Sequence, residues 1–130
     1  SLVGSEMCIR DRNVLGLRTS AAIARYAYYM LGYFIPDIRD LSENESLAYD
    51  WLINAHQGEV TLMFASMPVT ATSVHLAELC HERGIPLVVI TDREDTPVLE
   101  YATYQLVLPH TESTRATSLP FYMVLEALSN

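Results

Sequence analysis

Hydroxyl side chains gather directly after a short apolar stretch in the middle of the chain. Ser66 follows the run 59–65, and Thr70 and Thr72 stand just before a segment with helical spacing. Such a join leaves hydroxyls and unpaired backbone N–H groups at the carboxyl end of a strand and at a helix N-terminus, where open α/β sheets bind anions. The pattern indicates an anion site, but a simple N-cap role for Thr70 or Thr72 would also explain these residues.

A second loop of the same type follows the first predicted strand, 13–17. Gly16 lets the backbone turn tightly after this strand. Arg18 and Ser20 then supply a positive charge and a hydroxyl before a predicted helix over 21–31. The loop lacks the second and third glycines of a dinucleotide-binding fingerprint, so we expect no nucleotide cofactor, and no cofactor of another kind.

Other arrangements of reactive side chains are weak in this sequence. The histidines lie far apart and no His, Cys and acidic residues share a ligand spacing, so we expect no metal. A triad of Ser66, His110 and Asp92 would lack the Gly-x-Ser-x-Gly elbow. The acidic residues after Asp92 fit a solvated loop, and Cys80 fits a thiol buried on a helix. We therefore assign no catalytic residue.

Short apolar strands alternate with helical segments along the chain. Strands are predicted at 13–17, 36–41, 59–66, 85–90 and 104–108, and helices at 21–31, 47–56, 73–83, after Thr96 and at 118–128. This alternation predicts an α/β fold: a doubly wound five-stranded parallel sheet of flavodoxin-like order 2-1-3-4-5, in three α/β/α layers. The loops after the first and third strands would then meet at the switch point.

Helical periodicity also predicts which side chains form the core. Ile23, Ala27, Met30 and Phe34 share one face of the first helix, so we expect that face to be buried. Trp51 is expected in the core rather than as a stacking platform.

Composition restricts the class of protein. The 130 residues suit one domain, and half of them are hydrophobic, which suits a packed core. The net charge is −8 and every basic residue is arginine, so this chain should not bind nucleic acid by itself. We see neither an apolar run of about 18 residues nor a signal peptide, so we expect no membrane span and a cytoplasmic location.

Both ends of the chain suggest an incomplete protein. Residues 1–12 resemble a translated sequencing-library adapter, because codons for Leu2–Glu6 and Met7–Asp11 join into such a string. At the other end, Tyr122, Leu125 and Leu128 form a stripe that the C-terminus cuts in mid-pattern. We expect a non-native segment at 1–12 and a domain at 13–130 that is truncated at its C-terminus.

Residues 13–130 as a whole resemble a sugar isomerase (SIS) domain. The stretch Gly16-Leu-Arg-Thr-Ser20 is similar to the loop after that family's first strand. Phe64–Ser73 is similar to its Ser-x-Ser-Gly-x-Thr loop, and Val88–Asp92 and Thr96-Pro97 follow in the family's order. The details are most similar to the C-terminal effector domain of RpiR-type transcriptional regulators, which bind DNA through an N-terminal helix-turn-helix domain.

The resemblance implies a ligand site and partners. A phosphorylated sugar or related acidic metabolite would be held by Ser20, Ser66 and Thr70, with Arg18 and Thr72 beside them. DNA would be bound only through the missing N-terminal domain, and a homodimer or tetramer is expected. A sugar-phosphate isomerase of the same superfamily is the alternative. Because no glutamate lies between residues 66 and 73 to move a proton between carbons, we prefer a sensor that is not an enzyme.

Overall fold

The computed structural model describes residues 11–56, 58–66 and 69–108. Its strands form one parallel sheet in the order β2-β1-β3-β4-β5, which confirms the predicted topology. The strands are β1 (Asp11–Leu15), β2 (Ile38–Asp40), β3 (Glu59–Ala65), β4 (Leu87–Thr91) and β5 (Tyr104–Val107). β1 thus begins two residues earlier than predicted, inside the segment that resembles an adapter.

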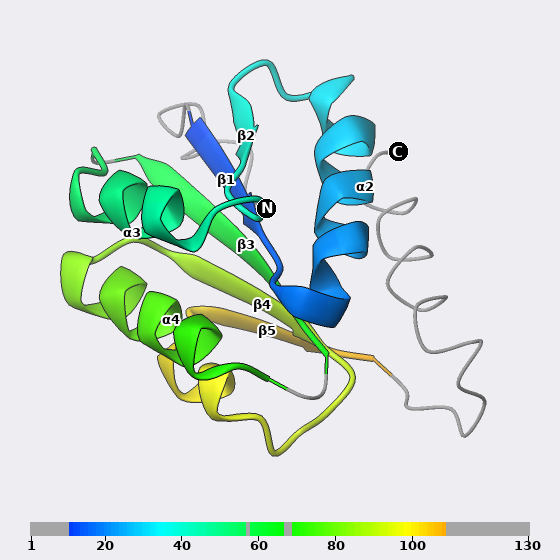
Figure 1. Cartoon of the computed structure of the whole chain (residues 1–130), viewed down its shortest axis with the longest axis vertical. Helices are drawn as coiled ribbons and strands as arrows, with labels where there is room; N and C mark the ends of the chain where they lie inside the picture. Colours follow the sequence, from blue (N-terminus) through cyan, green and yellow to red (C-terminus); the bar gives the residue numbers. More distant parts are fainter. Residues whose placement is uncertain (1–10, 57, 67–68, 109–130) are drawn as a thin grey trace.

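Helices cover both faces of the sheet, as the α/β/α prediction requires (Figure 1). The helical elements are η1 (Arg18–Ser20), α2 (Ala21–Gly32), α3 (Glu45–Ile53), α4 (Ala71–Arg83) and η2 (Pro97–Tyr101). Helix α2 packs on one face, and α3, α4 and η2 pack on the other. The predicted loop at 110–115 and helix at 118–128 lie outside the described residues. Within the described part of the chain, we find no helix long and apolar enough to cross a membrane.

Alternating strand residues divide the core between the two faces. Val14, Phe64 and Ile90 are buried toward α2, whereas Leu15 and Met63 are buried toward α3 and α4. This is the period of two that a strand imposes when both of its faces are covered.

Helix α4 contributes Cys80 to this core. The residue is fully buried, and burial raises the pKa of its thiol to about 11 despite a hydrogen bond with Thr61. A thiol with so high a pKa stays protonated and unreactive near neutral pH. Cys80 is therefore a core thiol, as predicted.

Two predicted core residues lie at the surface instead. Phe34 is 63% exposed because α2 ends at Gly32, and Leu31 packs into the core on that side. Trp51 is 37% exposed, and the guanidinium of Arg39 lies 3.9 Å from its ring centroid. Trp51 is therefore a stacking platform, contrary to the prediction, and the group stacked on it belongs to the protein itself.

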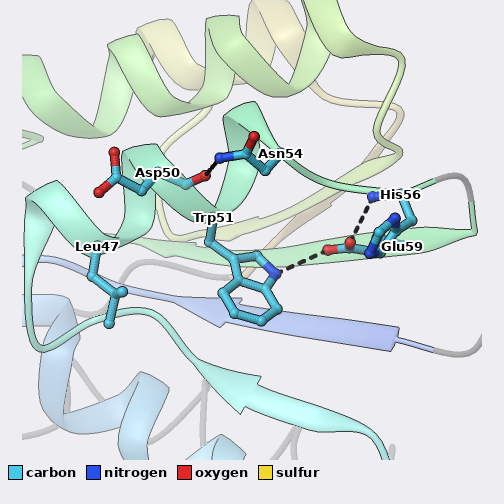
Figure 2. Close-up of a pocket in the computed structure, with 6 residues that line it drawn as sticks. All are labelled: Leu47, Asp50, Trp51, Asn54, His56 and Glu59. Atoms are coloured by element: carbon cyan, nitrogen blue, oxygen red, sulfur yellow. Dashed lines mark hydrogen bonds between the residues drawn. The ribbon is translucent and has the colours of Figure 1, made fainter.

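A buried carboxylate joins the elements at the amino edge of the sheet. Glu59 is 2% exposed. Its Oε1 accepts hydrogen bonds from Asn13 Nδ2 at 3.0 Å, Trp51 Nε1 at 3.2 Å and Arg39 Nη1 at 3.3 Å. The other oxygen, Oε2, accepts from the backbone N–H of His56 at 2.8 Å. Figure 2 shows Trp51 and His56 reaching this carboxylate from opposite sides. One side chain thus links β1, β2, α3 and β3.

The surroundings of Glu59 favour its charged form. Burial by itself raises the pKa of a carboxyl group. Here the hydrogen bonds from Asn13, the His56 backbone and Trp51, together with the charge of Arg39, outweigh burial and lower the pKa of Glu59 below its ordinary value. A carboxyl group with a lowered folded pKa stabilises the fold above its unfolded pKa. That contribution is lost as the pH falls through the folded pKa.

We expect Glu59→Gln to lower the free energy of unfolding by about 3 kcal/mol at pH 7, because a buried charge partner is removed. The difference from the unchanged protein should shrink as the pH falls below about 4, where the carboxyl of the unfolded chain is protonated. Urea denaturation between about pH 7 and pH 3.5 measures both effects. The exposed Asp37→Asn serves as the control. A Glu59→Gln deficit that stays constant over this range would contradict the assignment.

Candidate functional site

The loops after β1 and β3 meet through two serine side chains. Ser20 ends η1, and Ser66 directly follows β3. Their Oγ atoms lie 2.8 Å apart, and the backbone N–H of Ser66 donates to Ser20 Oγ at 3.0 Å. The structure therefore brings together the two hydroxyls that the sequence predicted at the switch point of the sheet.

Thr19 adds a third hydroxyl to this group. Its Oγ1 lies 3.3 Å from Ser66 Oγ, and the residue is exposed, whereas Ser20 behind it is 2% exposed. Thr19 was not among the site residues predicted from the sequence. Its position in the same short loop, next to Ser20, was the available signal, but which of two neighbouring hydroxyls faces solvent depends on the turn.

Close backbone packing holds the first loop in place. A Cβ atom on Gly16 would lie 2.4 Å from the carbonyl oxygen of Ser20, so only glycine fits there. The N–H of Gly16 donates to Ser42 Oγ at 3.0 Å, which attaches the loop to the segment after β2. The glycine predicted as a turn residue is thus required by a close approach between two backbone segments.

Arg18 adopts a left-handed backbone conformation, with φ at 58°. This region costs a non-glycine residue about 1 kcal/mol, and strain of this kind often marks functional loops. The residue is exposed at the entrance to η1. Its charge is therefore available to solvent on the same loop as Thr19 and Ser20.

The other two predicted site residues have structural contacts. Thr70 is the N-cap of α4: its Oγ1 accepts from the N–H of Ser73 at 3.1 Å. This is the capping role that the sequence left open. Thr72 lies inside α4, and its Oγ1 is 3.5 Å from Oε2 of Glu45 on α3. Neither contact joins the group formed by Ser20 and Ser66.

The electrostatic setting of the serine pair suits an anion. Ser20 precedes α2, and the loop that begins at Ser66 leads into α4, so two helix N-termini belong to this edge. Neither helix has an acidic residue in its first turn. Helix N-termini offer unpaired N–H groups and a positive dipole end. Hydroxyls and N–H groups can bind and orient an oxyanion, but they supply no strong base.

A hollow of about 390 Å³ lies at the opposite, amino edge of the sheet. It is lined by Leu47, Asp50, Trp51, Asn54, His56 and Glu59 (Figure 2). Its deepest polar group, the carboxylate of Glu59, is already engaged by four donors. We therefore place the ligand site at the serine pair and attribute the contacts in this hollow to stability.

The fold and the serine pair define an α/β domain that presents hydroxyls at a switch point. The SIS domain family matches residues 8–129, so the chain belongs to the SIS domain family. No curated protein matches the chain significantly.

Solved structures share this fold at low sequence identity. The sugar isomerase domain of an RpiR transcription factor from Sphaerobacter thermophilus is 22% identical, with a TM-score of 0.82 over 96% of this chain and 72% of that one. The Vibrio vulnificus NanR protein, complexed with ManNAc-6P, is 22% identical, with a TM-score of 0.77 over 99% of this chain. This chain spans 52% of the NanR chain. A protein of E. coli CFT073 in complex with a phosphosugar is 13% identical, with a TM-score of 0.77 over 98% of this chain and 72% of that one.

We expect Gly16→Ala to lower the free energy of unfolding by about 2 kcal/mol, because the added methyl group meets a backbone oxygen that cannot move aside. Gly32→Ala is the matched control. Its Cβ would have only Ile38 Cγ2 nearby, at 3.7 Å, and alanine favours the helix by up to about 1 kcal/mol. Urea midpoints of both variants test this. Equal stability of the two variants would contradict the close approach.

Arg18→Gly should leave the free energy of unfolding within about 0.5 kcal/mol of its original value, because relief of the left-handed strain offsets the extra freedom of glycine in the unfolded chain. Arg25→Gly, inside α2, is the comparison and should cost about 1 kcal/mol. Thermal unfolding of both variants measures the contrast. An equal loss at the two positions would show that Arg18 is not strained.

Proposed function

We propose that residues 13–130 form the phosphosugar-sensing effector domain of an RpiR-type DNA-binding regulator of carbohydrate metabolism. The observation that carries this proposal is the contact between Ser20 and Ser66, which joins the loops after β1 and β3 at the switch point. The likeness in fold to an RpiR domain and to NanR in complex with ManNAc-6P supports it. In the whole protein, DNA would be bound by a separate N-terminal domain.

The five residues implied by the family resemblance stay in the proposed site, with different weights. Ser66 stands where the two loops meet, and Ser20 holds it. Arg18 would supply charge from the exposed side of the first loop. Thr70 and Thr72 would contribute through the N-terminus of α4, since their hydroxyls already contact other residues.

The carboxyl end of β4 suggests how a phosphosugar would be oriented. Ala65 pairs with Thr91 in the sheet, so Ser66 and Asp92 follow at neighbouring strand ends. Asp92 is 7% exposed. A carboxylate repels phosphate and accepts hydrogen bonds from hydroxyl groups. The phosphate would therefore lie on the Ser20 side, and the sugar hydroxyls would lie toward β4.

A sugar-phosphate isomerase is the second candidate, favoured by the family's link to sugar isomerisation and by the likeness in fold to the phosphosugar complex from E. coli CFT073. Isomerisation requires a base that moves a proton between adjacent carbons. The segment 66–73 contains no acidic residue, and the described hydroxyls do not meet this need. We therefore favour a cytoplasmic sensor, assembled as a homodimer or tetramer, over an enzyme.

Ser66→Ala should raise the dissociation constant for a bound hexose phosphate at least about tenfold, because one hydrogen bond to a charged group contributes about 1.5 kcal/mol or more. A panel of sugar phosphates screened by thermal shift, followed by calorimetry of the best compound, measures this. Ser46→Ala, an exposed hydroxyl on α3, is the control and should bind normally.

Turnover of the same sugar phosphates, followed by NMR, separates the two candidate functions. Binding without interconversion supports the sensor. Interconversion of an aldose and a ketose phosphate would establish the isomerase instead. Absence of binding by any sugar phosphate would reject both candidates.

A further inference from the structure

The hydroxyls of Ser20, Ser66 and Thr19 form a chain that runs from the core to solvent. Ser20 Oγ is 2.8 Å from Ser66 Oγ, and Ser66 Oγ is 3.3 Å from Thr19 Oγ1. Ser20 is 2% exposed, Ser66 is half-buried and Thr19 is exposed. The inner end of the chain is therefore closed to a ligand, and the outer end is open.

The hydrogen-bonding capacity of Ser20 is taken up by Ser66. Its Oγ accepts from the Ser66 N–H at 3.0 Å and shares the 2.8 Å contact with the Ser66 hydroxyl. Its side chain makes no capping bond to its own helix, α2. The close approach of Gly16 to the Ser20 carbonyl fixes the backbone, so Ser20 cannot advance toward solvent.

The hydroxyl protons determine where the chain can donate. Each hydroxyl carries one donor proton and two acceptor lone pairs. Two contacts among three hydroxyls use two protons and leave one. An anion at the open end would orient the chain so that Ser20 donates to Ser66, Ser66 donates to Thr19, and Thr19 donates to the anion. Hydrogen bonds aligned in one direction strengthen one another.

We infer that Thr19 is the residue of the first loop that contacts the ligand's anionic group, and that Ser20 is a positioning residue that acts through Ser66. This inference rests on the proposed function, because it divides the roles within the same site. It changes the expectation for Ser20, which the family resemblance placed in direct contact with phosphate.

Removing each hydroxyl separately tests this division. Calorimetry with glucose 6-phosphate and with inorganic phosphate gives the dissociation constant, and thermal unfolding gives the melting temperature of the ligand-free chain. Thr19→Val keeps the shape and removes the hydroxyl. It should raise the dissociation constant about tenfold and leave the melting temperature within about 1 °C. Thr19→Ser keeps the hydroxyl and should restore binding.

Ser20→Ala should show the opposite pattern. It removes the partner of a backbone N–H, so the ligand-free melting temperature should fall by about 4 °C. Exchange of the Ser66 amide hydrogen, followed by NMR, should become faster. The dissociation constant should rise less than in Thr19→Val. The amide exchange rate reports the Ser66 contact directly, so a general loss of stability would not imitate it without affecting amides elsewhere equally.

Two results would overturn the inference in different ways. If Thr19→Val binds like the unchanged protein while Ser20→Ala loses binding about tenfold without a change in melting temperature, Ser20 is the direct contact and only this inference fails. If the unchanged protein binds neither glucose 6-phosphate nor inorganic phosphate, while other sugar phosphates are also inactive, the proposed function fails and the inference fails with it.

Discussion

The carboxylate of Glu59 is the constraint on which the arrangement of the sheet depends. It accepts hydrogen bonds from β1, β2, α3 and the segment before β3, and it is almost wholly buried. Shifting β3 by one residue would turn this charge toward the apolar face covered by α2. A buried charge without its partners costs several kcal/mol, so alternative registers are strongly disfavoured. Glu59 therefore fixes how β1, β2 and β3 align.

This alignment at the amino edge determines the geometry at the carboxyl edge. Asp11 lies opposite Glu59 and Leu15 lies opposite Met63, so β1 ends shortly before β3 does. The loop after β1 then reaches Ser66, which directly follows the end of β3. Because the contact consists of short hydroxyl side chains, small shifts in strand register would break it. The buried charge and the surface hydroxyls thus lie at opposite ends of the same strands, and the first supports the second.

Patterns that depend on near neighbours were readable from the sequence. The alternation of apolar strands with helices predicted the five-stranded order, and Gly84 correctly predicted the end of α4, where it adopts a φ of 69°. Contacts between distant segments were not readable. Trp51 was placed in the core because its partner Arg39 lies on another element, and Thr19 was overlooked because Ser66 is 47 positions away. Periodicity reports burial, not which polar groups meet.

The position of the serine pair also explains how this edge could serve a sensor. The loop holding Ser20 leads into α2 on one face of the sheet, and the loop beginning at Ser66 leads into α4 on the other. A ligand bridging the two loops would contact elements from both outer layers at once. Ligands shift a conformational equilibrium only by their differential affinity for its states. Contacts divided between two layers provide such a difference whenever the layers move relative to the sheet, whereas a site confined to one loop would not.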